Sequence, residues 1–184
     1  MDIEEVTGVL HDLEELVTMT RMNTEVKNNF IKMFSHAIPN MQALEAIKKF
    51  AGDKLILEIG SGVGFWAKLL KCLNVNIKPT DFVDPNLYTP FNHFCFIENI
   101  SNLKVLDEYP TEILMLCWTK TVISYDSLKK FKGKKLIYIG EEQGCKADDK
   151  FFQLLQNEWY LISNINIPNL DEAQDSVFLY IRKI

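Results

Sequence analysis

The sequence has no excess of basic residues and no long apolar run. Its 184 residues carry 20 Lys and Arg against 25 Asp and Glu, which gives a formal net charge of -5. Binding to nucleic-acid phosphates needs clustered positive charge, so general nucleic-acid binding is disfavoured. The one basic run, with lysines at 129, 130, 132, 134 and 135, is interpreted as a solvated helix end and loop rather than a binding patch. No run approaches the roughly 20 apolar residues that a membrane span requires, so we expect none.

Paired cysteines are also lacking. The four cysteines are dispersed and form no CxxC motif: Cys72, Cys95, Cys117 and Cys145. This favours reduced thiols in an intracellular protein over a disulfide framework or a zinc site. His93 lies two residues before Cys95 but no second ligand pair accompanies them, so we expect no metal. The N-terminal stretch MDIEEVTGVLHDLEE is acidic and differs from a signal peptide, which favours a cytoplasmic or nuclear protein.

The first part of the chain is predicted to be helical. Apolar residues recur at helical spacing in the first segment, at Ile3, Val6, Leu10, Leu13 and Val17. Acidic residues occupy the other face of this helix, which leaves two interpretations: a helix that covers one side of the domain, which we favour, or a surface for a protein partner. A second helix is predicted over residues 23–36, and Pro39 ends it and opens a third.

From Lys54 onward, short apolar strands alternate with helices. The run KLILEIG is nearly continuous, which is typical of a strand buried on both faces of a parallel sheet. Strands are predicted over residues 54–60, 75–82, 93–100, 112–118, 135–140, 160–167 and 176–183, and helices over 65–73, 124–131 and 148–159, the last capped by Asp148 or Asp149. The pattern predicts an α/β fold with a mainly parallel sheet and a closing antiparallel hairpin. We expect a helical extension at 1–36 and one domain at 37–184.

Three glycines lie between the first strand and its helix, in LILEIGSGVGFWAKLLK. In such sheets ligands bind beyond the carboxyl ends of the strands, and glycines let a ligand approach the main chain closely. The loop has the spacing GxGxG, with glycines at Gly60, Gly62 and Gly64. A dinucleotide fingerprint has the spacing GxGxxG and would require a glycine at position 65, where this chain has Phe65. A nicotinamide dehydrogenase is therefore disfavoured. The Lys and Ser or Thr of a P-loop are missing as well.

With Glu58 the loop reads E-x-G-x-G-x-G, which resembles the nucleotide-binding loop of class I S-adenosylmethionine-dependent methyltransferases. The resemblance implies a Rossmann-like class I methyltransferase fold of seven strands, with S-adenosyl-L-methionine as cofactor. It also implies an acid at the end of the second strand that accepts both ribose hydroxyls. Asp81 stands there, 17 residues after Gly64. Taken alone, Asp81 is equally a turn residue.

The residues that we expect to bind the cofactor are Glu58, Gly60, Ser61, Gly62, Gly64, Phe65, Asp81, Phe82, Glu98, Asn99, Cys117 and Trp118. The resemblance puts Glu98 or Asn99 near the adenine amino group. Trp118 has two open interpretations, a stacking surface for adenine or a flat substrate, and a hydrophobic residue at the rim. Cys117 is interpreted as a small buried residue, because nothing beside it would activate a thiolate. No catalytic residue is identified.

A closer resemblance is to an uncharacterised subgroup with four local signatures: Ala37-Ile38-Pro39, Phe65-Trp66, Leu116-Cys117-Trp118 and Gly140-Glu141. In that subgroup two prolines follow the tryptophan and fix a carbonyl that accepts a hydrogen bond from a target amino group. This chain has Thr119 and Lys120 instead. Two hypotheses follow: a methyltransferase with an unknown methyl acceptor, and a catalytically degenerate methyltransferase fold that serves as a binding or scaffold subunit.

Overall fold

The computed structural model describes residues 2–19, 24–82, 93–142, 149–170 and 174–183. Seven strands form one sheet in the order β3-β2-β1-β4-β5-β7-β6. The strands are β1 (Ile56–Ile59), β2 (Ile77–Asp81), β3 (Glu98–Asn99), β4 (Ile113–Cys117), β5 (Lys135–Glu141), β6 (Trp159–Asn166) and β7 (Asp175–Arg182). The helices are α1 (Ile3–Met19), α2 (Thr24–Met33), α3 (Met41–Ala51), α4 (Phe65–Cys72), α5 (Asn102–Glu108), α6 (Thr121–Lys130) and α7 (Asp149–Glu158).

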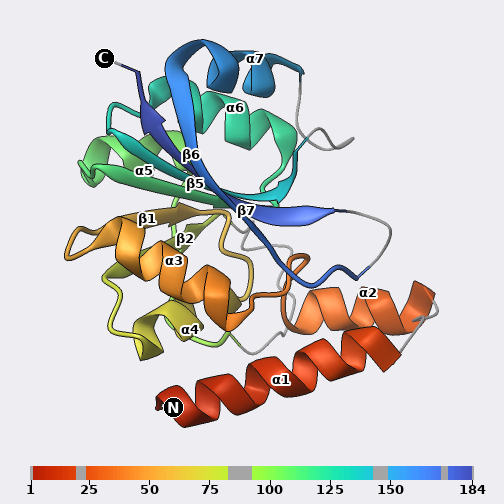
Figure 1. The fold of residues 1–184 in the computed structure, drawn as a ribbon. Coiled ribbons are helices and arrows are strands. Elements are labelled where there is room, and N and C mark those ends of the chain that lie inside the picture. Colours follow the sequence, from red (N-terminus) through yellow and green to blue (C-terminus); the bar gives the residue numbers. More distant parts are fainter. Residues whose placement is uncertain (1, 20–23, 83–92, 143–148, 171–173, 184) are drawn as a thin grey trace.

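The sheet lies between two layers of helices, with α1 to α4 on one face and α5 to α7 on the other (Figure 1). The side chains of a strand alternate between the faces, so each central strand contributes to two cores. In β4, Ile113, Met115 and Cys117 pack with the first helical layer, and Leu114 and Leu116 pack with the second. Burial on both faces explains the continuous apolar runs of β1 and β4.

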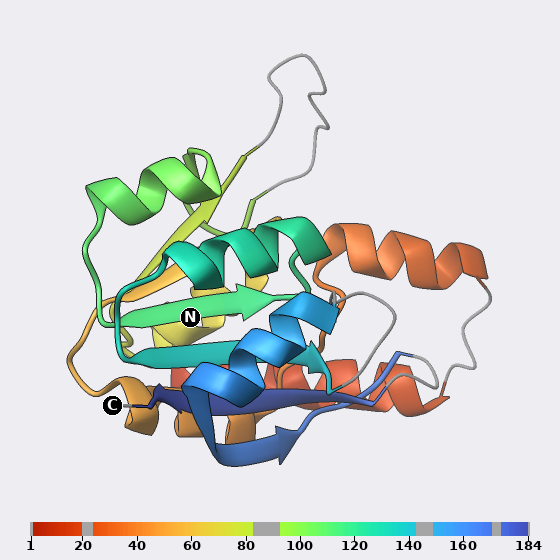
Figure 2. The same cartoon turned by 90° about the horizontal axis from the view of Figure 1, so that it is seen from above.

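The strand order places a reversal of direction beside β1. The chain runs outward from β1 through β2 to β3 and then returns to β4, which pairs with the other side of β1. All of these pairs are parallel, so their carboxyl ends share one edge of the sheet, and α2 lies on that side (Figure 2). Ligands of open α/β sheets bind at such a reversal.

The predicted closing hairpin is confirmed. β7 pairs antiparallel with both β5 and β6 and so lies between them in the sheet. The predicted seven-stranded, mainly parallel sheet is confirmed as well.

The N-terminal helices pack on the same face as α3 and α4. Val6, Leu10 and Leu13 of α1 and Phe30 of α2 are buried in the core of that face, whereas Ile3 is exposed. This is the packing expected of a helix that covers one side of a domain. The division at residue 36 and the role of α1 in binding a partner stay predictions.

The third predicted strand is much shorter than residues 93–100, because only Glu98 and Asn99 pair with β2. The backbone N–H of Phe94 instead donates a hydrogen bond to the carbonyl of Val63 in the glycine loop (2.9 Å), which draws this segment away from the sheet. The second helix ends at Met33, three residues before the predicted end. Of the predicted caps of the last helix, Asp148 lies outside the described residues and Asp149 is the first residue of α7.

None of the helices in the described part of the chain is long and apolar enough to cross a membrane. The described residues likewise include no group of three or more His, Cys, Asp or Glu side chains arranged to hold a metal ion.

Candidate functional site

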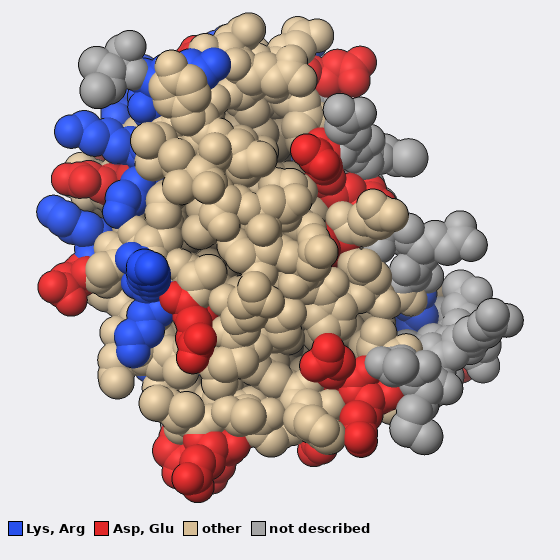
Figure 3. Space-filling model, in the orientation of Figure 1, with Lys and Arg blue, Asp and Glu red and all other residues tan. Residues whose placement is uncertain are grey.

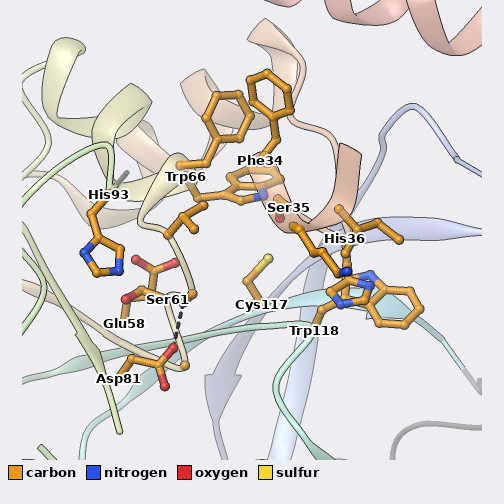
Figure 4. Close-up of a pocket in the computed structure, with 16 residues that line it drawn as sticks. Phe34, Ser35, His36, Glu58, Ser61, Trp66, Asp81, His93, Cys117 and Trp118 are labelled. Carbon is orange, nitrogen blue, oxygen red and sulfur yellow. Dashed lines mark hydrogen bonds between the residues drawn. The ribbon is translucent and has the colours of Figure 1, made fainter. Parts of the chain in front are cut away.

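A cavity of about 340 Å³ opens at the carboxyl ends of β1, β2 and β4, beneath the end of α2 and the turn that follows it (Figure 4). Eight of the twelve predicted cofactor residues line it: Glu58, Gly60, Ser61, Gly62, Phe65, Asp81, Cys117 and Trp118. The other four do not line it. Residues from three separate strand ends therefore meet in one cavity, as the sheet topology requires.

The glycine loop needs its glycines for two different reasons. Gly60 has a φ of +76°, and a Cβ at this position would lie 2.9 Å from Cγ2 of Thr119, so the loop and the segment after β4 approach too closely for a side chain. Gly62 has a φ of +56°, but a Cβ there would have no atom within 4 Å. The space beside Gly62 is therefore open to the cavity.

Asp81 ends β2 and holds the loop in place. Its Oδ2 accepts a hydrogen bond from the N–H of Gly62 (2.8 Å), and its Oδ1 accepts one from the N–H of Phe82 (2.7 Å). An ionised carboxylate has about four acceptor sites, so two remain for a ligand. The half-buried carboxylate thus orders the loop and still faces the cavity.

Glu58 is the second acid of the cavity, and its environment differs from that of Asp81. The Glu58 side chain is only 1% exposed, and its buried Oε2 has no hydrogen-bond partner among the described residues. Burial in the core raises the pKa of this carboxyl to about 8, and the negative charge of Asp81 adds to the increase, while Lys71 opposes it. A buried polar atom without a partner is costly, and this one belongs to a residue that lines the cavity.

The end of β3 does not contribute to the cavity. Glu98 instead contacts Lys78, with 2.6 Å between Oε2 and Nζ, and accepts a hydrogen bond from the hydroxyl of Tyr109 (3.1 Å). These two partners lower the pKa of Glu98. Asn99 is exposed and also lies outside the cavity. The roles that we predicted for these two residues near adenine stay predictions, without support from the cavity's lining.

The two remaining predicted residues serve the loop rather than the cavity. Gly64 precedes α4 and packs against Cys95, whose Sγ would lie 3.0 Å from a Cβ at this position. Phe82 is 66% exposed and contributes its N–H to Asp81.

Trp118 follows β4 in a left-handed conformation, with a φ of +47°, which a bulky residue rarely adopts. The ring of His36 stacks on it, with 5.2 Å between the ring centres and 15° between the planes (Figure 4). Trp118 lines the cavity, which agrees with both interpretations of this residue. The Cys117 thiol beneath it is buried, and burial raises its pKa well above the usual range, so the thiol is not an activated nucleophile.

The predicted cofactor residues include none from the N-terminal segment, although residues of that segment line the cavity. The cavity is also lined by Ile31, Lys32, Phe34, Ser35 and His36, all from the end of α2 and the turn after it. This segment is connected directly to α4, because the buried indole N–H of Trp66 donates a hydrogen bond to the carbonyl of Ala37 (3.0 Å). Two of the local signatures, Ala37-Ile38-Pro39 and Phe65-Trp66, are thus in contact. Their joint presence in the sequence was the one indication that the N-terminal segment packs beside the glycine loop.

The segment that has Thr119 in place of the first proline is held by side-chain hydrogen bonds. The hydroxyl of Thr119 donates to the carbonyl of Ile59 (3.2 Å), and the hydroxyl of Ser124 donates to the carbonyl of Thr119 (3.2 Å). The methyl group of Thr119 packs against Gly60. The two prolines of the resembled subgroup are missing here, and in this structure side-chain hydrogen bonds hold the turn.

Basic side chains gather away from this edge. Figure 3 shows Lys and Arg mainly on one side of the molecule, and the acidic groups mainly on the other side and below. The basic run of residues 129–135 lies at the end of α6 and the start of β5, whereas the cavity lies at the opposite, carboxyl edge. The acidic, basic and histidine side chains that line the cavity are Lys32, His36, Glu58, Asp81 and His93.

No family model matches the chain, and no curated protein matches its sequence. Its fold is similar to many solved structures. The O-methyltransferase from Bacillus cereus in complex with SAH shares 13% identity, with a TM-score of 0.57 over 98% of this chain and 100% of that chain. A mutant of MtNAS in complex with S-adenosylmethionine shares 11% identity, with a TM-score of 0.55 over 97% of this chain and 73% of that one.

The ribosomal protein L11 methylase from Lactobacillus delbrueckii subsp. bulgaricus shares 16% identity, with a TM-score of 0.52 over 80% of this chain and 82% of that chain. Likenesses at such low identity establish the fold. The chain has the Rossmann-like fold of class I methyltransferases, with the sheet and antiparallel hairpin described above.

Proposed function

We propose that this protein is a methyltransferase that binds S-adenosyl-L-methionine in the cavity at the glycine loop. The observation that carries the proposal is the pair of unlike carboxyl groups in that cavity. Asp81 is fixed by two backbone N–H groups and has free acceptor sites, while Glu58 is buried with an oxygen that lacks a partner among the described residues. The class I fold of the solved neighbours supports the same assignment.

The residues present fit this cofactor. Asp81 would hold the ribose hydroxyls, Glu58 would face the α-ammonium group, and the open space beside Gly62 would admit the ligand against the backbone. When bound, S-adenosyl-L-methionine supplies a methyl group on a positively charged sulfur. The task of this chain is then to hold and orient, because methyl transfer needs chiefly the approach of a nucleophile in line. This also accounts for the lack of an evident catalytic side chain.

The charge of the cavity opposes a dinucleotide. A nicotinamide cofactor would bring a pyrophosphate to the loop, where the carboxylate of Asp81 repels anions and Lys32 is the one lysine or arginine in the described lining. A nucleoside with a cationic end matches the same charges. This argument agrees with the glycine spacing and does not depend on it.

The solved neighbours add support for the cofactor. The Bacillus cereus O-methyltransferase was crystallised with SAH, and the MtNAS mutant with S-adenosylmethionine. We propose further that the chain belongs to the subgroup that shares its four local signatures and acts inside the cell, in the cytoplasm or nucleus. Its methyl acceptor is unidentified.

Binding is tested by titrating S-adenosylhomocysteine into wild type, Gly62→Val and Gly52→Val. The two glycines are matched: φ is +56° and +59°, and in both cases a Cβ would meet nothing within 4 Å. Each variant therefore places a β-branched residue at a positive φ, which strains the backbone and lowers stability. We expect Gly62→Val to lose binding and Gly52→Val to keep it, because Gly62 lines the cavity and Gly52 does not. Equal affinity in all three proteins would contradict the assignment of the site.

Turnover separates the two functional hypotheses. Pure protein is incubated with S-adenosylmethionine labelled on its methyl group and fractionated cell extract. Transfer of label to a fraction, lost in Gly62→Val, supports a methyltransferase. Binding without transfer to any fraction supports the scaffold instead.

A further inference from the structure

Glu58 lines the cavity at the carboxyl edge of the sheet and is nevertheless cut off from solvent. It is 1% exposed, and its Oε2 has no hydrogen-bond partner among the described residues. Its backbone carbonyl is already engaged, because it accepts a hydrogen bond from the hydroxyl of Thr80 (2.7 Å). An ionised carboxylate in this position would be desolvated and unpaired, which is far more costly than a neutral carboxyl group.

The surroundings of Glu58 do not offset such a charge. β2 brings Asp81, a second negative charge that shares the cavity with Glu58. α4 brings Lys71, whose opposing effect is the smallest of the three on Glu58, and β4 brings the buried thiol of Cys117. The remaining titratable groups that face the cavity or interact with Glu58 are Lys32, His36, His93 and Cys95.

We propose that Glu58 carries a proton in the ligand-free protein and releases it when a nucleoside with an ammonium group binds beside it. The proposal rests on the proposed function and adds to it that cofactor binding is coupled to proton release. The O–H bond of the carboxyl group breaks, the proton passes to the buffer, and the carboxylate keeps the electron pair and faces the ligand's cation.

The coupling follows from competition between two cations for one buried acceptor. Below about pH 8, where the pKa of Glu58 lies, a proton occupies the group, and the ligand must displace it. The ionised fraction rises tenfold for each pH unit in this range, so affinity for the ammonium-bearing ligand rises by the same factor. The ligand's own ammonium stays protonated below about pH 7.5. Affinity should therefore increase about tenfold per pH unit from pH 5.5 to 7.5.

The experiment is calorimetric titration of the full chain at several pH values in this range. Buffers with different ionisation enthalpies report how many protons are released. The probes are S-adenosylhomocysteine, which carries the α-ammonium, and methylthioadenosine, which keeps the adenine and ribose but lacks the ammonium. We expect close to one proton released at pH 6.5 with the first probe and none with the second, whose affinity should not depend on pH.

Glu58→Gln provides a matched variant, because the amide is close in size and cannot release a proton. It keeps His36 and His93, so proton release that persists in this variant would come from another group and would overturn the proposal. The comparison of the two probes on wild type stands even if the variant does not fold. S-adenosylhomocysteine that binds wild type with flat affinity and no proton release overturns the coupling alone. A failure of S-adenosylhomocysteine to bind at any pH overturns the proposed function together with the coupling.

Discussion

The ends of β1 and β3 each carry a glutamate, and the fold gives the two side chains opposite environments. Glu98 contacts a lysine and a tyrosine hydroxyl, which lower its pKa. Glu58 lies two strands away in the same sheet, is buried, and has a pKa raised to about 8. Both were candidate site residues in the sequence. The difference shows that two acids on strands of one sheet differ in pKa because one has protein partners and the other is buried without one.

The largest expected effect is on how stability depends on pH. Folded Glu58 keeps its proton up to about pH 8, whereas the unfolded chain releases it near 4.5, the ordinary value. Between these values the unfolded state binds fewer protons, so a rise in pH favours unfolding. Relative to Glu58→Gln, wild type without ligand should lose up to about 1.4 kcal/mol of stability per pH unit. Denaturant unfolding at pH 5 to 8 measures this, and parallel curves for the two proteins would contradict it.

Next in size is the loss of Asp81. Asp81→Ala removes the acceptor of the proposed ribose hydrogen bonds, and water replaces it only in part. The binding free energy of S-adenosylhomocysteine should therefore weaken by about 2 kcal/mol, which raises Kd roughly 30-fold. Asp81→Asn should fall between wild type and Ala. Its oxygen still accepts, but its NH₂ group would face one of the two backbone N–H groups that the carboxylate now binds. Titration of S-adenosylhomocysteine ranks the three proteins, and equal affinities would make Asp81 a turn residue only.

A smaller effect is expected where the N-terminal segment joins the site. Trp66→Phe leaves the carbonyl of Ala37 without its indole donor, at a cost of about 1–2 kcal/mol in stability. Trp159→Phe is the control, because that indole nitrogen is buried without a hydrogen-bond partner in the described part of the chain. Thermal unfolding should show the greater loss for Trp66→Phe. The opposite ranking would mean that the Trp66 hydrogen bond contributes little.

The smallest effect is predicted for Glu98→Gln, which completes the comparison with Glu58. The ion pair with Lys78 is about one-quarter exposed on each side, so its loss should cost no more than about 1 kcal/mol. Affinity for S-adenosylhomocysteine should not change, because Glu98 does not line the cavity. If Glu98→Gln lost as much affinity as Asp81→Ala, Glu98 would have to contribute to cofactor binding after all.

The sequence was sufficient for those features that depend on local pattern. The buried strands, the closing hairpin, the glycine loop and the acid at Asp81 each depend on spacing or on a run of one residue type, and the structure confirms the strands and the hairpin. The short β3 could not be predicted, because the competing partner of Phe94 is a carbonyl 31 residues earlier. The contact of His36 with Trp118 was equally hidden, since it joins residues 82 positions apart.

The partners of the strand-end acids were beyond the sequence for the same reason. Lys78 is 20 residues from Glu98, and no local pattern shows that Glu98 has this partner or that Glu58 has none. Burial of a particular carboxyl group is a property of the assembled core. The sequence pattern placed both glutamates on strands of the sheet, but it could not tell which of them would be left without a partner.

The insertion of β7 between β5 and β6 has a consequence for how the chain folds during synthesis. β5 ends at Glu141, but the strand that pairs with its outer edge begins at Asp175. While the intervening residues are made, β5 presents unpaired backbone groups and the apolar side chains of Leu136, Ile137 and Ile139, which the finished fold buries. An open, apolar strand edge is a template for pairing with other chains. Sheet completion is thus a late event, and the interval before it is when nascent chains are most exposed to aggregation.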